Sequence, residues 1–172
     1  GMSGAGKSTA LNVLEDEGYY CVDNMPISLI IKFADLAANQ DEGYSNIALG
    51  IDIRSGHALS ELNEVLKKLE SRHYNYKILF LDSNDDVLVK RYKETRRTHP
   101  ILISNKASTL VEAIEYERKL ARPISKEANM VIDTTHLKGN KFQQLLENQF
   151  NHQSIDPFRI SFVSFGYKHG IP

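Results

Sequence analysis

The first nine residues, GMSGAGKST, combine residue types suited to holding phosphate groups. The spacing Gly1-x4-Gly6-Lys7-Ser8 fits the P-loop pattern, in which backbone N–H groups surround phosphates, a lysine reaches the β and γ phosphates and a hydroxyl binds Mg²⁺. Gly4 and Gly6 can adopt backbone angles that a side chain would forbid. A helix after such a loop directs its positive N-terminal end at the anion. This phosphate loop, residues 1–8, therefore predicts binding of ATP or GTP with Mg²⁺; the alternative is a flexible glycine-rich terminus.

Apolar runs that end in aspartate offer candidate ligands for the metal ion. In P-loop proteins an acidic residue at the end of a neighbouring strand helps to hold Mg²⁺. The strand order common to nucleoside-monophosphate-kinase-like domains favours Asp52 as this ligand and, together with Lys7, as a catalytic residue. Asp23 is the alternative ligand, and Ser8 supplies the hydroxyl. For Asp82, which also ends an apolar run, a helix cap and a direct ligand role are equally supported.

A basic segment, KRYKETRR at residues 90–97, contains five cations and a single acid, whereas the whole chain has a net charge of -1. Arginines on a lid can neutralise charge during phosphoryl transfer, which makes Arg91, Arg96 and Arg97 lid candidates. A solvated helix face and contact with RNA phosphates are the alternatives.

Strand-like and helix-like segments alternate along the chain. Apolar runs of strand length occupy residues 19–23, 47–53, 77–82 and 130–133, and residues at helical spacing lie between them, beginning with a helix over 7–17. This alternation predicts an α/β fold with a doubly wound, mostly parallel sheet and right-handed crossovers. With the phosphate loop, the expected fold is a P-loop NTPase of the nucleoside-monophosphate-kinase-like type.

The predicted nucleotide-binding domain covers residues 1–150. Residues 151–157 are polar and turn-prone and are expected to form a linker, and residues 158–172 are expected to begin a truncated second domain. Because a P-loop joins a buried strand to a helix, we also expect a further strand upstream of Gly1.

Composition limits the functional classes that remain. The chain has 172 residues, of which 41% are hydrophobic, enough for one well-buried domain. A net charge of -1 gives no overall basic field for nucleic acid or a membrane surface. With one cysteine, Cys21, no apolar run of membrane-spanning length and scattered histidines, we expect a cytoplasmic protein without a membrane partner or a transition-metal centre.

Several longer motifs resemble the RapZ/YvcJ family of P-loop nucleotide-binding proteins. They are GMSGAGKSTALNVLEDEGYYCVDNMP, IDIRSG, LFLDSNDDVLVKRYKETRRTHP, VIDTT and FVSFGYKHGIP, and together they span nearly the whole chain. The resemblance implies a kinase-like N-terminal domain that binds ATP and GTP and hydrolyses them slowly, followed by a C-terminal domain. In some relatives the full-length protein is an adaptor that presents small RNAs to an endoribonuclease.

The resemblance also assigns contacts by position. It implies an ATP-type phosphate loop at residues Gly1, Met2, Ser3, Gly4, Ala5, Gly6, Lys7 and Ser8, and a GTP-contacting motif at Asp52, Ile53, Arg54 and Ser55. An RNA or protein partner would act through the C-terminal domain, so we expect little RNA binding by these 172 residues. A P-loop kinase for a small molecule is the alternative function, and self-association into a homo-oligomer stays open.

Overall fold

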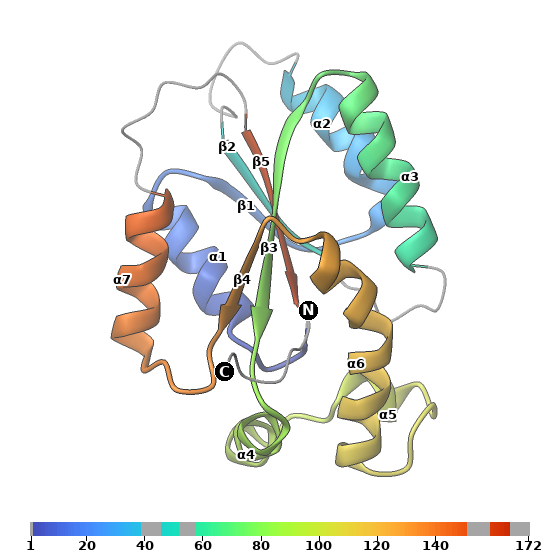
Figure 1. Ribbon diagram of the computed structural model, residues 1–172, viewed down its shortest axis with the longest axis vertical. Helices are drawn as coiled ribbons and strands as arrows, with labels where there is room; N and C mark the ends of the chain where they lie inside the picture. The colour runs from blue at the N-terminus through green and yellow to red at the C-terminus, as the bar shows by residue number, and fades with distance from the viewer. Residues whose placement is uncertain (1, 39–45, 52–57, 151–158, 166–172) are drawn as a thin grey trace.

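Parallel strands form a five-stranded sheet in the part of the chain that the structure describes (Figure 1). The computed structural model describes the chain outside residues 1, 39–45, 52–57, 151–158 and 166–172. The strand order is β1-β2-β5-β3-β4, and each neighbouring pair is parallel. The strands are β1 (Tyr20–Met25), β2 (Asn46–Ile51), β3 (Asn75–Asp82), β4 (Met130–Asp133) and β5 (Arg159–Phe165).

Helices cover both faces of this sheet. Helices α1 and α7 pack on one face, and α2, α3 and α6 lie over the other, while α4 and α5 lie beyond the carboxyl edge (Figure 1). The helical bounds are α1 (Lys7–Asp16), η1 (Ile27–Leu29), α2 (Ile30–Ala38), α3 (Ala58–Ser71), α4 (Asp85–Thr95), α5 (Pro100–Ile103), α6 (Leu110–Glu127) and α7 (Gly139–Phe150).

Two hydrophobic cores, one on each face of the sheet, explain why the strand sequences are continuous apolar runs. Ile78 and Phe80 of β3 pack into the core beneath α2, α3 and α6, whereas Leu79 and Leu81 pack into the core beneath α1 and α7. Successive strand residues point to opposite faces, so both sets must be apolar. Burial of each such side chain contributes about 1.5–3 kcal/mol. The prediction of a parallel α/β sheet covered on both faces is confirmed.

The start of α4 and the order of the strands differ from what the sequence predicts. Asn84, not Asp82, caps α4, because its side chain accepts a hydrogen bond from the Val87 N–H at 2.9 Å. Because Asn84 is the N-cap, the helix-cap alternative for Asp82 is wrong, and the Asp82 side chain is buried. Strand β5 lies between β2 and β3. It occupies the position beside β2 that the kinase-like strand order assigns to the expected strand upstream of Gly1.

The predicted domain boundary stays a prediction, since the linker at residues 151–157 lies outside the described residues. Strand β5 of the expected second domain pairs here with β2 and β3 of the first. No helix in the described ranges is both long enough and apolar enough to cross a membrane.

Candidate functional site

A cavity of about 660 Å³ opens at the carboxyl edge of the sheet. This volume is within the usual range for small-molecule sites, roughly 300–1,000 Å³. Its position also agrees with the rule that ligands of parallel α/β sheets bind beyond the carboxyl ends of the strands. Its walls come from the phosphate loop, the ends of β1 and β2, the α4–α5 region and the start of α7. The lining includes Met2, Ser3, Gly4, Ala5, Gly6, Lys7, Ser8, Thr9, Asp23, Asn24, Ile51, Arg91, Tyr92, Arg97, Thr98, Thr134 and Phe142.

The phosphate loop has the backbone geometry that its glycines predict. Gly4 has φ +93° and Gly6 has φ +106°, which are left-handed values that L side chains rarely adopt. Gly6 is the N-cap of α1, and it has no side chain with which to accept hydrogen bonds from the first-turn N–H groups. The first-turn N–H groups and the positive end of α1 therefore lie at the cavity wall, where Ser8 and Thr9 are exposed.

Lys7 joins the phosphate loop to the end of β1. Its Nζ lies 2.8 Å from Asp23 Oδ1 and donates to Asn24 Oδ1 at 3.1 Å. The β1–β2 register shifts between Val22 and Met25, and Asn24 has φ 55°. This irregularity places both Asp23 and Asn24 on the cavity wall, with the Asn24 N–H donating to Asp23 Oδ1 at 2.7 Å.

Gly50 of β2 leaves room for this ion pair. A Cβ atom at Gly50 would lie 2.6 Å from Asp23 Oδ1 and 3.3 Å from Lys7 Cδ. Any larger residue would therefore displace the carboxylate. The glycine permits Asp23 and Lys7 to meet over the strand.

Arg91 ties the phosphate loop to the end of β4. Its guanidinium donates to Gly4 O at 3.0 Å, to Thr134 Oγ1 at 3.1 Å and to Thr134 O at 2.9 Å. Thr134 Oγ1 also lies 3.0 Å from Ala5 O. Burial lowers the pKa of Arg91, opposed by the negative charges of Asp133 and Glu94. Because its guanidinium binds Gly4 and Thr134, Arg91 supports the loop in this structure.

The donor groups suit Mg²⁺ held jointly with phosphates. Mg²⁺ prefers oxygen ligands and is usually bound by one or two carboxylates, substrate phosphates and water. The Ser8 hydroxyl and the Asp23 carboxylate line the same cavity. Asp23 and Ser8 are therefore the described residues that would hold the ion, while Asp52 lies outside the described residues.

Comparison with known proteins gives the chain its family. The RapZ-like N-terminal domain matches residues 1–154. The chain belongs to the RapZ-like N-terminal domain family. The resemblance to the RapZ/YvcJ family drawn from the motifs is thereby confirmed.

Relatives of this family match the chain along its length. It is 46% identical over 173 residues to a nucleotide-binding protein of Lachnoclostridium phytofermentans, covering 100% of the chain and 60% of the relative. A nucleotide-binding protein of Syntrophomonas wolfei is 44% identical, with 100% and 57% covered. One from Clostridioides difficile is also 44% identical, with 99% and 59% covered. The chain thus spans less than two thirds of these relatives.

The structure gathers some of the predicted site residues and does not describe others. Met2 to Ser8 line the cavity together with Arg91 and Arg97, whereas Arg96 is exposed and not among the described lining residues. Gly1 and the motif Asp52, Ile53, Arg54 and Ser55 lie outside the described residues. The roles assigned to all of these residues stay predictions.

The environment of Cys21 does not favour a nucleophilic thiolate. Its thiol donates to Leu11 O at 3.3 Å. Burial, with the negative charge of Glu15, raises the pKa of Cys21 to about 11. A packing role within β1 agrees with this environment.

Four further residues near the site were missed from the sequence. Asn24 lies within β1, and Thr134 directly follows β4. His99 and Glu117 are buried behind the loop. Glu117 carried a usable signal, because it occupies an apolar position in the helical pattern of Leu110 and Ile114, where a charged residue needs a partner.

Proposed function

We propose that this chain binds ATP and GTP with Mg²⁺ in the cavity above the phosphate loop. The carrying observation is that Lys7, Ser8 and the start of α1 face the same cavity as the carboxylate of Asp23. The Lys7 ammonium would exchange Asp23 and Asn24 for phosphate oxygens. The N–H groups of the loop would bind the remaining oxygens. The names of the relatives support a nucleotide as the ligand class.

Slow hydrolysis, in place of rapid phosphoryl transfer, is part of the proposal. Mg²⁺ would neutralise charge on the β and γ phosphates when bound. Lys7 would orient the same phosphates, and Arg97 on the facing wall would approach the transferred group. Lys7 and Asp52 remain the catalytic pair proposed from the sequence, with Asp23 as the alternative acid.

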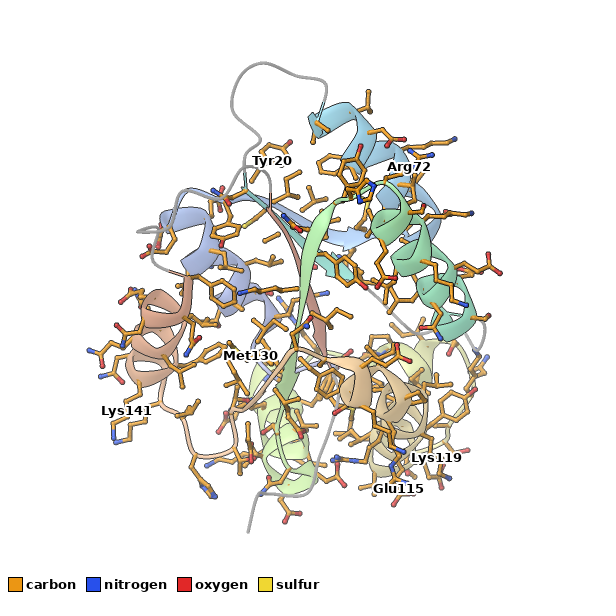
Figure 2. The ribbon with its side chains drawn as sticks, turned by 45° about the horizontal axis from the view of Figure 1, so that its top comes forward. Tyr20, Arg72, Glu115, Lys119, Met130 and Lys141 are labelled. Atoms are coloured by element: carbon orange, nitrogen blue, oxygen red, sulfur yellow. The ribbon has the colours of Figure 1, made fainter. Side chains whose placement is uncertain are left out.

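Calorimetric titration with ATP and GTP, each with Mg²⁺, tests the binding site. Lys7→Ala should weaken binding by about tenfold or more, because a charge-assisted contact to phosphate is lost. Lys141→Ala is the matched control: Lys141 is exposed and points outward from α7, away from the cavity (Figure 2). Equal affinity in Lys7→Ala and wild type, with both folded, would contradict the proposal.

A P-loop kinase for a small molecule is the second candidate function. It is favoured by the cavity wall of Tyr92, Arg97 and Thr98, which faces the phosphate loop and offers space for a second substrate. A screen of phosphate acceptors with labelled ATP separates the two candidates. Slow release of inorganic phosphate without transfer supports the proposed function, and fast transfer to any metabolite supports the kinase.

For the longer protein we propose a regulatory adaptor role, as the RapZ/YvcJ resemblance implies. Nucleotide occupancy of this domain would report to a second domain that holds a small RNA or protein partner. RNA binding by the 172 residues alone should be weak, because the net charge is -1. Cytoplasmic location belongs to the same proposal.

A further inference from the structure

Two buried polar side chains, His99 and Glu117, lie directly behind the phosphate loop. Their exposed fractions are 0% and 3%. Neither is among the residues that line the cavity. Burial of such groups is costly unless each forms specific hydrogen bonds, so their partners indicate what they do.

Glu117 of α6 holds Ser3 of the phosphate loop. The Ser3 N–H lies 3.0 Å from Oε1 and 3.2 Å from Oε2 of Glu117, and the Ser3 hydroxyl donates to Oε1 at 3.0 Å. The two residues are 114 positions apart in the sequence. One carboxylate therefore fixes both the main chain and the side chain of Ser3.

His99 holds the other side of the same carboxylate. Its Nε2 lies 2.9 Å from Glu117 Oε2, and its Nδ1 accepts the Ile101 N–H at 3.2 Å. A ring nitrogen that accepts a hydrogen bond carries no proton, so the proton is on Nε2 and is donated to Glu117. The main-chain N–H of Ile101 thus fixes the tautomer of His99. The Nε2–H of that tautomer in turn fixes the orientation of the Glu117 carboxylate.

This arrangement requires a carboxylate and rejects an amide. Every group that faces Glu117 from Ser3 and His99 is a donor, and a carboxylate accepts on both oxygens. A glutamine would place an NH₂ group against either the Ser3 donors or the His99 Nε2–H. The negative charge itself disfavours nearby phosphate. The contribution of Glu117 to phosphate binding is therefore geometric.

The same cluster contacts the opposite wall of the cavity. The His99 ring lies 5.0 Å from the Tyr92 ring, centroid to centroid. Tyr92 lines the cavity, as do Thr98 and Pro100 on either side of His99. Glu117 is thus bonded to the phosphate loop on one side and, through His99, to the wall that contains Arg97 and Thr98.

We propose that Glu117 is a positioning residue that holds the phosphate loop in its binding geometry before the nucleotide arrives, with His99 orienting its carboxylate. The inference rests on the proposed nucleotide-binding function. A loop ordered in advance loses less conformational freedom on binding, so its affinity is higher for the same contacts.

The test compares Glu117→Gln with wild type and with Glu115→Gln. Glu115 is exposed on the outer side of the same helix, so the control makes the same chemical change away from the loop (Figure 2). Calorimetry with Mg²⁺-ATP should show affinity about tenfold weaker or more for Glu117→Gln. The affinity of Glu115→Gln should match wild type. If Glu117→Gln does not fold, Glu117→Asp, which keeps the charge but shortens the reach, replaces it with the same expected loss.

Hydrogen exchange of the Ser3 amide, followed by NMR without nucleotide, gives a second readout. The amide should be protected in wild type and in Glu115→Gln, and should exchange about tenfold faster or more in Glu117→Gln. Loss of melting temperature with unchanged ATP affinity would overturn the positioning role. So would an unprotected Ser3 amide in wild type. Wild type that binds no ATP would overturn the proposed function, and the inference with it, whereas binding that Glu117→Gln leaves intact overturns the inference alone.

Discussion

At the residue scale, the proposed nucleotide site requires Lys7 to exchange its present partners for phosphate oxygens. In this structure Lys7 is bound by Asp23 at 2.8 Å and by Asn24 at 3.1 Å. The pair is partly exposed, with side-chain exposures of 23% and 38%, so it contributes little to stability. The proposed exchange of these partners for phosphate oxygens would therefore cost little free energy.

Asp23 is the described carboxylate best placed to support Mg²⁺, and its substitution tests that role. Asp23→Asn should lower Mg²⁺-dependent ATP affinity by about tenfold, since a carboxylate ligand is lost. Metal-free affinity should stay the same or rise, because Lys7 no longer has an anionic partner in Asp23. Titration with and without Mg²⁺ measures both quantities.

Two further variants sharpen this comparison. Gly50→Ala should reproduce the Asp23→Asn result, because a Cβ atom at Gly50 would lie 2.6 Å from Asp23 Oδ1. Asp52→Asn tests the ligand that the sequence favours. Of the two aspartate variants, the one that loses more Mg²⁺-dependent affinity identifies the acid that holds the ion.

At the element scale, local signals explain which parts of the site could be predicted. The phosphate loop is a contiguous motif, and its glycine geometry at Gly4 and Gly6 follows from residue type. The strands are short apolar runs whose burial on both faces leaves a clear pattern. The place of Asp23 on the cavity wall depends instead on the irregularity near Asn24, which no local pattern encodes, and Asp52 lies outside the described residues.

Contacts between distant segments were beyond such reasoning. Glu117 meets Ser3 across 114 positions, and its partner His99 has no motif of its own. Strand β5 takes a central place in the sheet although it is the last of the described strands in the sequence. Strand order reflects competition among several apolar runs for the same neighbours, so it is decided by the whole fold.

Two arginines of the basic segment, Arg91 and Arg97, have different environments in the structure, and substitution of each tests whether their roles differ. Arg91 is half-buried and binds main-chain oxygen atoms, so Arg91→Ala should lower the free energy of unfolding by about 1–3 kcal/mol. Arg97 is exposed on the cavity wall, so Arg97→Ala should leave the melting temperature unchanged and weaken ATP binding.

Lys93→Ala is the control for both variants. Lys93 is exposed on α4 and is not among the described residues that line the cavity, so neither property should change. Thermal unfolding measures the melting temperature of the three variants, and calorimetry measures their ATP affinity. A loss of melting temperature in Arg97→Ala, or none in Arg91→Ala, would contradict this division of roles.

At the scale of the whole molecule, the cavity depends on strands that come from both ends of the chain. Strand β5 pairs with β2 from Asn46↔Arg159 to Gly50↔Val163, and with β3 from Asn75↔Arg159 to Leu81↔Phe165. It therefore joins the β1–β2 side, which carries Asp23 and Asn24, to the β3–β4 side, which Thr134 directly follows. The relative position of the two cavity walls follows from this central strand.

Truncation after Phe150 tests whether β5 belongs to this domain. Without it, β2 and β3 would expose unpaired N–H and C=O groups along buried apolar strands, an arrangement that favours aggregation. Residues 1–150 should then show no cooperative thermal unfolding and no measurable ATP binding, whereas residues 1–172 should show both. A matched chain that keeps residues 151–172 but carries Val163→Pro separates pairing from length, because proline removes the N–H donor of a central strand. If residues 1–150 unfold cooperatively at the melting temperature of residues 1–172, the sheet does not need β5, and the boundary predicted at residue 150 is correct.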